Sequence, residues 1–431
     1  MNIKARKAAG GHDTPALPLE EARARILAAV EPLTDVETVS IHQALHRVLA
    51  EPVAAAIDVP AHTNSAMDGY ALRGSDVAEA GTALQLIGES FAGRPFQGLV
   101  GPGECVRIMT GAVVPEGSDT VIMQEQTARD GDQVRFEKPA KPGSNVRPAG
   151  EDLARGDVAL HPGRWLTPAD LGVLASVGVP DVRVRRKPKV AFFSTGDELK
   201  PVGQILEPGQ IHDSNRYTLF GLLTELGVEI EDLGIVPDQR EALDEALQRA
   251  SRCDAVLSTG GASVGDADYV VEALEKLGNV GFWQVAMKPG RPLAFGKINQ
   301  AWFFGLPGNP VSAMVTFLQL VRPALVALAG AEPMLPLQMS LPVTHPIKKR
   351  PGRREFQRGR LVTNDHGLTV TPFGHQGSGV LRSMSEADCL INLGPDVGDV
   401  VAGATVVVEP FAQPVWNGAR IQAPNQDQAS S

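Results

Sequence analysis

The sequence predicts a multidomain protein of the α/β and β classes. Its centre is an α/β domain with a parallel sheet, joined by a β insertion domain, a helical domain and a C-terminal domain resembling a β-barrel. Three observations lead to this prediction. The chain has 431 residues, which is too long for one compact core. Strand-like and helix-like runs alternate over residues 184–330. Short apolar runs broken by Gly and Pro fill residues 53–148 and 331–413.

The remaining segments complete the order along the chain. Residues 17–32 place apolar side chains on one helical face, and residues 167–179 begin with Thr167 as an N-cap and Pro168 as the first helical residue. Both ends lack apolar content and are expected to be disordered tails. The expected parts are a tail (1–15), a helical domain (16–52 with 149–183), a β insertion (53–148), an α/β domain (184–330), a C-terminal β domain (331–413) and a tail (414–431).

Composition excludes several classes of protein. The net charge of −10 argues against a general nucleic-acid binder. No apolar run approaches the ~20 residues of a membrane span, and the N-terminus has no apolar signal segment. The three cysteines, Cys105, Cys253 and Cys389, match neither a disulfide framework nor a zinc spacing. We therefore expect a cytoplasmic protein.

Four segments place unusual residues where strands of the α/β domain end. They are "STGDEL" with Asp197 and Glu198, the glycine-rich "STGGASVGDADY", "MKPGRP" with Lys288 and Arg291, and "GLPGNPVSA" with Ser312. Ligands of open α/β sheets bind at this edge. Each loop alone is common in α/β proteins and carries little information. Together, glycine amides, cations and carboxylates indicate a phosphate-bearing ligand with Mg²⁺.

The C-terminal β region carries a second basic segment. Residues 346–360 hold seven Lys or Arg residues against one glutamate. One interpretation is a charged edge strand that resists aggregation, and the other is an anion site. The segment "GHQGS" (374–378) adds glycine amides and a hydroxyl, which are suitable partners for an oxyanion.

Nine motifs in one order resemble the molybdopterin molybdenumtransferase family, of the bacterial MoeA type and including the E domain of gephyrin. They are "NSAMDGYA", "RIMTGA", "GEDL", "FSTGDEL", "STGGASVGDADY", "MKPGRP", "GLPGNPVSA", "FQRG" and "GHQGS", within residues 17–411. The resemblance implies a Mg²⁺-dependent transferase that inserts molybdate into adenylylated molybdopterin and releases AMP. It also implies a homodimer of four-domain subunits, whose α/β domain binds molybdopterin. The adenylyltransferase that supplies the substrate is a further expected partner, whereas nucleic acid and membranes are not.

The resemblance also implies roles for individual residues. Asp68, on its Gly-flanked turn, would act across the dimer interface. The implied catalytic residues are Asp68, Thr110, Asp152, Glu198, Asp238, Asp268 and Lys288. Glu198, Asp266 and Asp268 would hold Mg²⁺. Gly260, Gly261 and Ser263 would cradle the pterin phosphate or pyrophosphate. Lys288, Arg291, Pro292, Ser312, Arg358 and Ser378 would bind molybdate.

One position departs from the family pattern. Relatives carry a lysine where this chain has Gln284, so either that lysine is dispensable or a nearby base such as Lys297 replaces it. Two other functions stay open. One is a non-catalytic scaffold of the same fold, which would not need its acids and cations intact. The other is a generic Mg²⁺-dependent nucleotide hydrolase, which would release AMP without molybdate.

Overall fold

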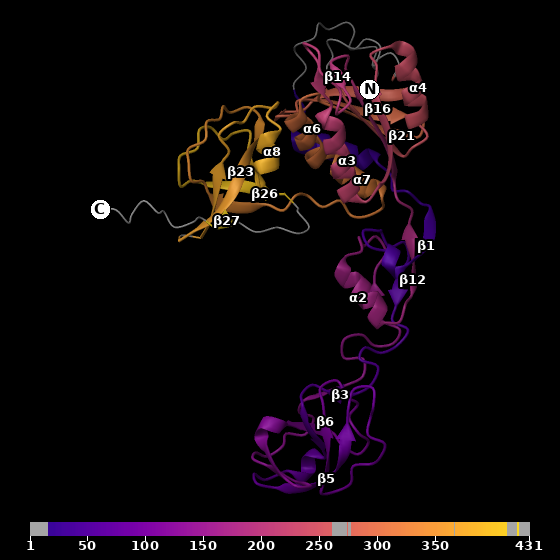
Figure 1. The fold of residues 1–431 in the computed structure, drawn as a ribbon, viewed down its shortest axis with the longest axis vertical. Coiled ribbons are helices and arrows are strands. Elements are labelled where there is room, and N and C mark those ends of the chain that lie inside the picture. The colour runs from indigo at the N-terminus through magenta and orange to yellow at the C-terminus, as the bar shows by residue number, and fades with distance from the viewer. Residues whose placement is uncertain (1–15, 261–273, 275–276, 366, 412–419, 422–431) are drawn as a thin grey trace, which may run out of the picture. The chain divides into compact units, whose positions relative to one another are not determined.

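The computed structural model describes residues 16–260, 274, 277–365, 367–411 and 420–421. The chain forms two compact units (Figure 1). The first combines Met1–Asp35 with Arg185–Ser431, and the second is Val36–Val184. Residues 16–35 therefore lie with the α/β part of the chain and not with residues 149–183.

A six-stranded sheet forms the centre of the first unit. Its strand order is β16 (Glu229–Val236), β13 (Lys189–Thr195), β17 (Ala255–Thr259), β21 (Ala301–Leu306), β20 (Pro292–Ile298) and β18 (Gly278–Gln284). The first four strands are parallel, as expected. The expectation of a wholly parallel sheet is wrong for β20, which runs antiparallel to both its neighbours. The short turn at Asn299 joins β20 directly to β21, and a hairpin of this kind pairs strands only in antiparallel fashion.

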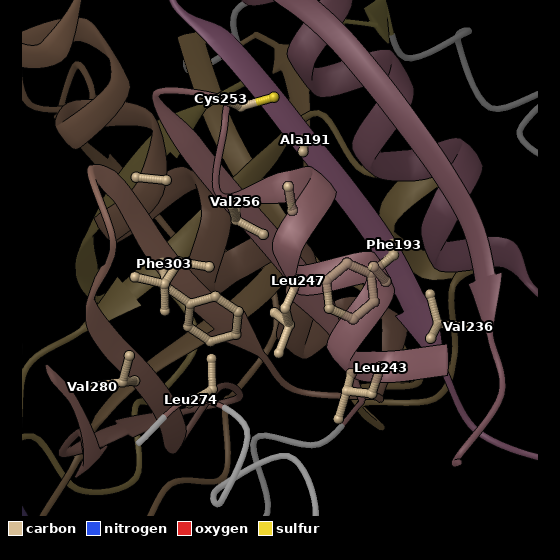
Figure 2. Packing of buried hydrophobic residues seen from close by; sticks show 14 of the residues in the cluster. Ala191, Phe193, Val236, Leu243, Leu247, Cys253, Val256, Leu274, Val280 and Phe303 are labelled. Atoms are coloured by element: carbon tan, nitrogen blue, oxygen red, sulfur yellow. The ribbon is translucent and has the colours of Figure 1, made fainter. Parts of the chain in front are cut away.

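Helices cover both faces of this sheet. On one face, α4 (Arg240–Ala250) inserts Leu243 and Leu247 into a cluster with Phe193 and Phe303 (Figure 2). Successive residues of a strand point to opposite faces, so Phe192 faces the other side. On that face, α3 (Ser214–Leu226) and α6 (Pro310–Thr316) contact the sheet. The chain from β13 to α3 contains two short strands, β14 (Leu199–Lys200) and β15 (Ile211–His212), which pair with each other.

One long helical run crosses the first unit. It consists of α6 (Pro310–Thr316), a π-helical turn η5 (Phe317–Val321) and α7 (Arg322–Leu328). Pro323 has no N–H, so the Gln319 carbonyl lacks the donor that an α-helix would supply. Arg23, from α1 (Leu19–Ala29), donates its Nε to that carbonyl at 3.0 Å. This bond joins α1 to the π-helical turn, and α1 also buries Leu19, Ala22 and Ile26.

The same run corrects an expectation drawn from the sequence. Pro310–Leu328 has 19 residues with a mean hydropathy of 1.7, which is long and apolar enough to cross a membrane. The expectation that no apolar run approaches this length is therefore wrong. In the structure 72% of the apolar window is buried inside the protein, which is the usual environment of a core helix.

A second sheet contains most of the C-terminal region. Its order is β19 (Met287–Lys288), β23 (Arg354–Asn364), β25 (Cys389–Leu393), β26 (Thr405–Pro410) and β22 (Met339–Pro342), with β24 (Gly367–Pro372) and β27 (Arg420–Ile421) also paired to β23. A short helix, α8 (Arg382–Glu386), follows the 374–378 loop. Strand β19 comes from the α/β part and pairs in parallel with β23. This pairing attaches the C-terminal sheet to the α/β domain.

The second unit is mainly β-structure. Its sheet has the order β7 (Thr120–Met123), β4 (Gly69–Leu72), β6 (Glu104–Ile108), β5 (Ala83–Ser90), β9 (Gln133–Phe136) and β8 (Thr127–Asp130). Three short antiparallel pairs join β1 (Val36–Ser40) to β12 (Asp181–Arg185), β2 (Val53–Ala54) to β11 (Val158–Leu160), and β3 (Asn64–Ser65) to β10 (Val146–Arg147). Helix α2 (Pro168–Ser176) begins as expected, with Thr167 and Asp170 forming a capping box.

Candidate functional site

A pocket of about 790 Å³ opens where the α/β domain meets the C-terminal sheet. The α/β domain contributes the end of β17, the turn from β19 to β20 and the turn from β21 to α6. The C-terminal part contributes β23 and the loop before α8. The lining residues that carry the argument are Gly260, Lys288, Arg291, Ser312, Glu355 and Arg358. Of the residues predicted to bind substrate, Pro292 and Ser378 line this pocket too.

Two glycines allow these turns to come together. Gly260 has φ +85°, and a Cβ there would lie 2.3 Å from the Thr195 carbonyl oxygen. Gly290 has φ +101°, and its Cβ would lie 2.6 Å from Thr316 Oγ1. A side chain at either position would therefore be both strained and crowded. Gly260 thus allows the turn after β17 to approach the end of β13 closely.

The 374–378 loop rests on the first turn of α6. Val311 donates its backbone N–H to the Ser378 carbonyl at 3.1 Å, and Ser312 beside it is buried. From α3, Asn215 Nδ2 donates to the Gly308 carbonyl at 2.7 Å and holds the turn before α6. These contacts place Ser378, in the loop, and Ser312, in α6, on one wall of the pocket.

Arg358 is fully buried, at 1% exposure. Its Nη2 donates to the carbonyls of His375 at 3.2 Å and Gly377 at 3.1 Å, and its Nε donates to Ser383 Oγ at 2.9 Å. Burial lowers the pKa of the guanidinium to about 10. Nη2 therefore holds the loop and Nε contacts α8, whereas Nη1 donates to none of the described residues. Arg358 both lines the pocket and positions Ser378.

Lys288 and Glu355 form the central ion pair of the pocket. Lys288 Nζ lies 3.1 Å from Glu355 Oε1, and Gln357 Nε2 donates to the same oxygen at 2.9 Å. Lys288 is half-exposed, whereas Glu355 is buried. Burial lowers the pKa of nearby Lys349, and the Glu355 charge acts in the opposite direction.

Sequence reasoning did not single out Glu355. The available signal was its position as the one acid among seven cations in residues 346–360. Arg353, from the same run, also lines the pocket and forms no ion pair with a described residue. The interpretation as a charged edge strand is wrong for residues 354–360, because β23 pairs with β19, β24 and β25. Anion binding by this run stays a prediction. Lys348, which precedes β23, is exposed and pairs with Asp399.

Two of the predicted acids, Glu198 and Asp238, follow the ends of β13 and β16. Thr195 Oγ1 donates to Asp238 Oδ1 at 2.7 Å, so these two strand ends share a hydrogen bond. Gly196 has φ +150°, and a Cβ there would lie 2.5 Å from Glu198 Oε2. The glycine leaves room for the Glu198 carboxylate over the turn, and such an oxygen donor fits Mg²⁺.

Part of the predicted set cannot be placed. Gly261, Ser263, Asp266 and Asp268 lie outside the described residues. Within the described part of the chain, no three His, Cys, Asp or Glu residues gather as a metal site. The three cysteines are buried and free, and burial raises the pKa of Cys105 and Cys389 to about 12.

The second unit brings two predicted residues together. Asp68 Oδ1 accepts hydrogen bonds from Thr110 Oγ1 at 2.6 Å and from Thr110 N at 2.7 Å. These bonds lower the pKa of the Asp68 carboxyl, with a smaller contribution from Arg107. Among the described residues, Asp152 makes no side-chain hydrogen bond with this pair; its backbone N–H donates to Val59.

Lys297 does not replace the missing lysine at position 284. In the register of β18 and β20, Gln284 pairs with Pro292, whereas Lys297 pairs with Asn279. Five residues of strand separate Pro292 from Lys297, a distance of about 17 Å. The Lys297 ammonium lies 5.1 Å from the Trp302 ring centroid instead. The suggestion of Lys297 as the substitute is therefore wrong.

Comparisons with known proteins match nearly the whole chain. Family models match at residues 17–178 (MoeA N-terminal region, domain I and II), 191–327 (probable molybdopterin binding domain) and 340–411 (MoeA C-terminal region, domain IV). A molybdopterin molybdenumtransferase of Haemophilus influenzae is 46% identical over 399 residues, covering 92% of this chain and 98% of its own length. The chain belongs to the molybdopterin molybdenumtransferase family.

Other members of the molybdopterin molybdenumtransferase family support this conclusion. A relative from Nostoc sp. is 42% identical over 305 residues, covering 69% of this chain and 70% of the relative. The solved structure of a molybdopterin biosynthesis moeA protein from Pyrococcus horikoshii OT3 has a TM-score of 0.79 at 30% identity, covering 92% of this chain and all of that one. Membership confirms the resemblance carried by the nine motifs, and with it the fold class. The roles of individual residues stay predictions.

Proposed function

We propose that this chain inserts molybdenum from molybdate into adenylylated molybdopterin and releases AMP, as a transferase of molybdenum cofactor biosynthesis. The observation that carries the proposal is the pocket, in which Lys288, Arg291, Arg353 and Arg358 lie beside the Ser312 hydroxyl. A tetrahedral dianion suits this mixture of cations, hydroxyls and backbone amides. The relatives are molybdopterin molybdenumtransferases, which supports this reaction class.

The pocket residues have separable tasks in this reaction. Arg291 and Arg353 at the rim attract the dianion, and Lys288 and Ser312 bind its oxygens. The turn at Gly260 places backbone amides near the phosphate groups of the adenylate. When water attacks the phosphoanhydride bond and AMP leaves, Lys288 offsets charge on the phosphate oxygens. Sulfur comes from the dithiolene of the substrate, since the three cysteines are buried and fully protonated at neutral pH.

Mg²⁺ is the cofactor that we propose for this site. Glu198 would supply one carboxylate, together with Asp266 and Asp268 outside the described residues. Bound Mg²⁺ supplies positive charge to phosphate oxygens. The carboxylates at this edge would otherwise repel the phosphates that the glycine turn attracts. Excess chelator should stop AMP release and added Mg²⁺ should restore it; full activity in chelator contradicts the assignment.

We further propose a cytoplasmic homodimer in which Asp68 of one subunit serves the pocket of the other. The observation behind this is the Asp68–Thr110 pair, which lowers the pKa of a partly exposed carboxyl in the second unit. Asp68→Ala and Asp268→Ala should each be inactive alone. Mixed and allowed to exchange chains, they should recover part of the activity. A monomer by light scattering, or no recovery after proven exchange, contradicts the shared site.

AMP release from adenylylated molybdopterin with and without molybdate tests the central proposal. We expect release to require molybdate and to yield molybdenum bound to the pterin in equal amount. Release without molybdate would instead identify a Mg²⁺-dependent nucleotide hydrolase. No release under either condition, from a folded protein that binds the adenylate, would identify a scaffold.

A further inference from the structure

The pocket contains one carboxylate among its cations. Among the lining residues that the structure describes, Lys288, Arg291, Arg353 and Arg358 carry positive charge, and Glu355 alone carries negative charge. An acid inside an anion pocket opposes binding, so its presence there requires a reason. A carboxylate on the open surface would need no further explanation, but the Glu355 side chain is only 10% exposed.

Strand pairing places Glu355 in this position. In the parallel pairing of β19 with β23, Lys288 is the direct partner of Glu355. Oε1 of Glu355 accepts from both Lys288 and Gln357, at 3.1 Å and 2.9 Å. Its Oε2 accepts a hydrogen bond from none of the described residues. The carboxylate is thus fixed through one oxygen and retains the capacity to interact through the other.

This arrangement makes Lys288 a shared cation. An anion in the pocket competes with Glu355 for the ammonium, and the carboxylate repels the anion directly. Both effects scale with the charge of the anion, because a Coulomb energy is proportional to each charge. A dianion therefore loses about twice the binding free energy that a monoanion loses. A transferred ion must also leave its pocket, and a weakened ground state assists that step.

We propose that Glu355 is a positioning and specificity-determining residue that holds Lys288 against the pocket wall and sets the affinity of the pocket for tetrahedral dianions relative to monoanions. The inference rests on the proposed anion pocket and adds a residue that opposes tight binding there. In this inference the Glu355 carboxylate reduces the positive charge that the pocket offers to an anion. Gln357 orients that carboxylate.

Glu355→Gln tests the inference, because it removes the charge and keeps an oxygen that accepts from Lys288. Calorimetric titration would compare molybdate with perrhenate, a tetrahedral monoanion, at constant ionic strength. We expect the variant to bind perrhenate about threefold and molybdate about tenfold more tightly, since a doubled energy squares the fold-change. In turnover with the adenylate, KM for molybdate and kcat should both fall.

Matched variants separate charge from fold. Glu355→Asp keeps the charge and should retain the wild-type ratio of the two affinities. Glu241→Gln makes the same charge change on exposed α4, away from the pocket lining, and should alter neither affinity. Circular dichroism and a thermal melt check the fold of each variant. If Glu355→Gln does not fold, Glu355→Ala provides the same neutral pocket.

The outcomes distinguish this inference from the function on which it rests. A greater gain for molybdate than for perrhenate supports the role of Glu355. Equal gains, or no gain, in a folded variant overturn it while leaving the anion pocket intact. A wild-type protein that binds neither ion overturns the anion pocket and this inference together.

Discussion

Lys288 Nζ lies 3.1 Å from Glu355 Oε1, across the pairing of β19 with β23. The two residues are separated by 67 positions in the sequence. Sequence reasoning treated Lys288 as a free cation for the oxyanion. In the structure the lysine already has a partner.

Removing Lys288 should weaken molybdate binding in a way that depends on Glu355. Lys288→Ala loses a charge-assisted contact, with an expected cost of roughly 1.5–3 kcal/mol, and leaves the Glu355 charge unopposed. Adding Glu355→Gln should recover part of the lost affinity. The measurement is molybdate titration of the two single variants and the double variant. Strictly additive effects would show that the two side chains do not interact.

Arg358 should prove important for the loop as well as for the anion. Arg358→Lys keeps the charge but cannot serve His375, Gly377 and Ser383 together. We expect a loss of about 1–3 kcal/mol in unfolding free energy, because buried carbonyls lose their donor, and weaker molybdate binding. Urea unfolding and molybdate titration measure the two effects. Arg360→Lys is the control: it pairs with half-exposed Glu386 and should cost under about 1 kcal/mol.

The Asp68–Thr110 hydrogen bond predicts a pH dependence. The bond lowers the pKa of Asp68, so the carboxylate stays charged until the pH falls through that lowered value. Thr110→Val removes the side-chain donor and keeps the backbone donor, so the pKa should rise toward its usual range. Carboxyl ¹³C NMR measures it directly, and activity should be lost at a higher pH than in the wild type. Thr82→Val, whose hydroxyl donates to the Glu79 carbonyl, should leave the Asp68 titration unchanged.

Glu409 should contribute strongly to stability. Its buried carboxylate accepts from Gln319 at 2.6 Å, Asn392 at 2.6 Å and Gln338 at 3.0 Å. Glu409→Ala leaves three amide donors without their acceptor, and we expect a loss of about 3–5 kcal/mol in urea unfolding. Glu245→Ala, on the exposed side of α4, should change stability by under about 0.5 kcal/mol. A small effect at Glu409 would mean that water replaces the carboxylate.

Gln284→Lys tests the departure from the family pattern. Gln284 pairs with Pro292 at the start of β20, and Pro292 lines the pocket. An added ammonium there should leave molybdate affinity unchanged or tighten it by up to about threefold, since an exposed charge is strongly screened. The same titration measures this. Weaker binding would show that the glutamine itself has a role.

Much of the site was predictable because its signals are local. Gly260 follows a strand of five buried residues, and a glycine at a strand end marks a tight turn. Ser312 follows a Gly/Pro turn before an apolar run, which predicts a helix start. The pairing of Asp68 with Thr110 was anticipated only through the family resemblance, since 42 residues separate them.

The sequence by itself determined the family, the order of strands and helices, and the loops that carry the chemistry. Periodicity and turn residues report the local backbone, and nine motifs in order identify relatives. Only the tertiary structure decided that β20 runs antiparallel, that Lys297 lies at the far end of β20, that Arg358 is buried behind the loop, and that Glu355 shares Lys288 with the pocket. These facts depend on strand direction and register between distant segments. A side chain's partner across a sheet changes with every shift of register, and no local pattern in either strand specifies it.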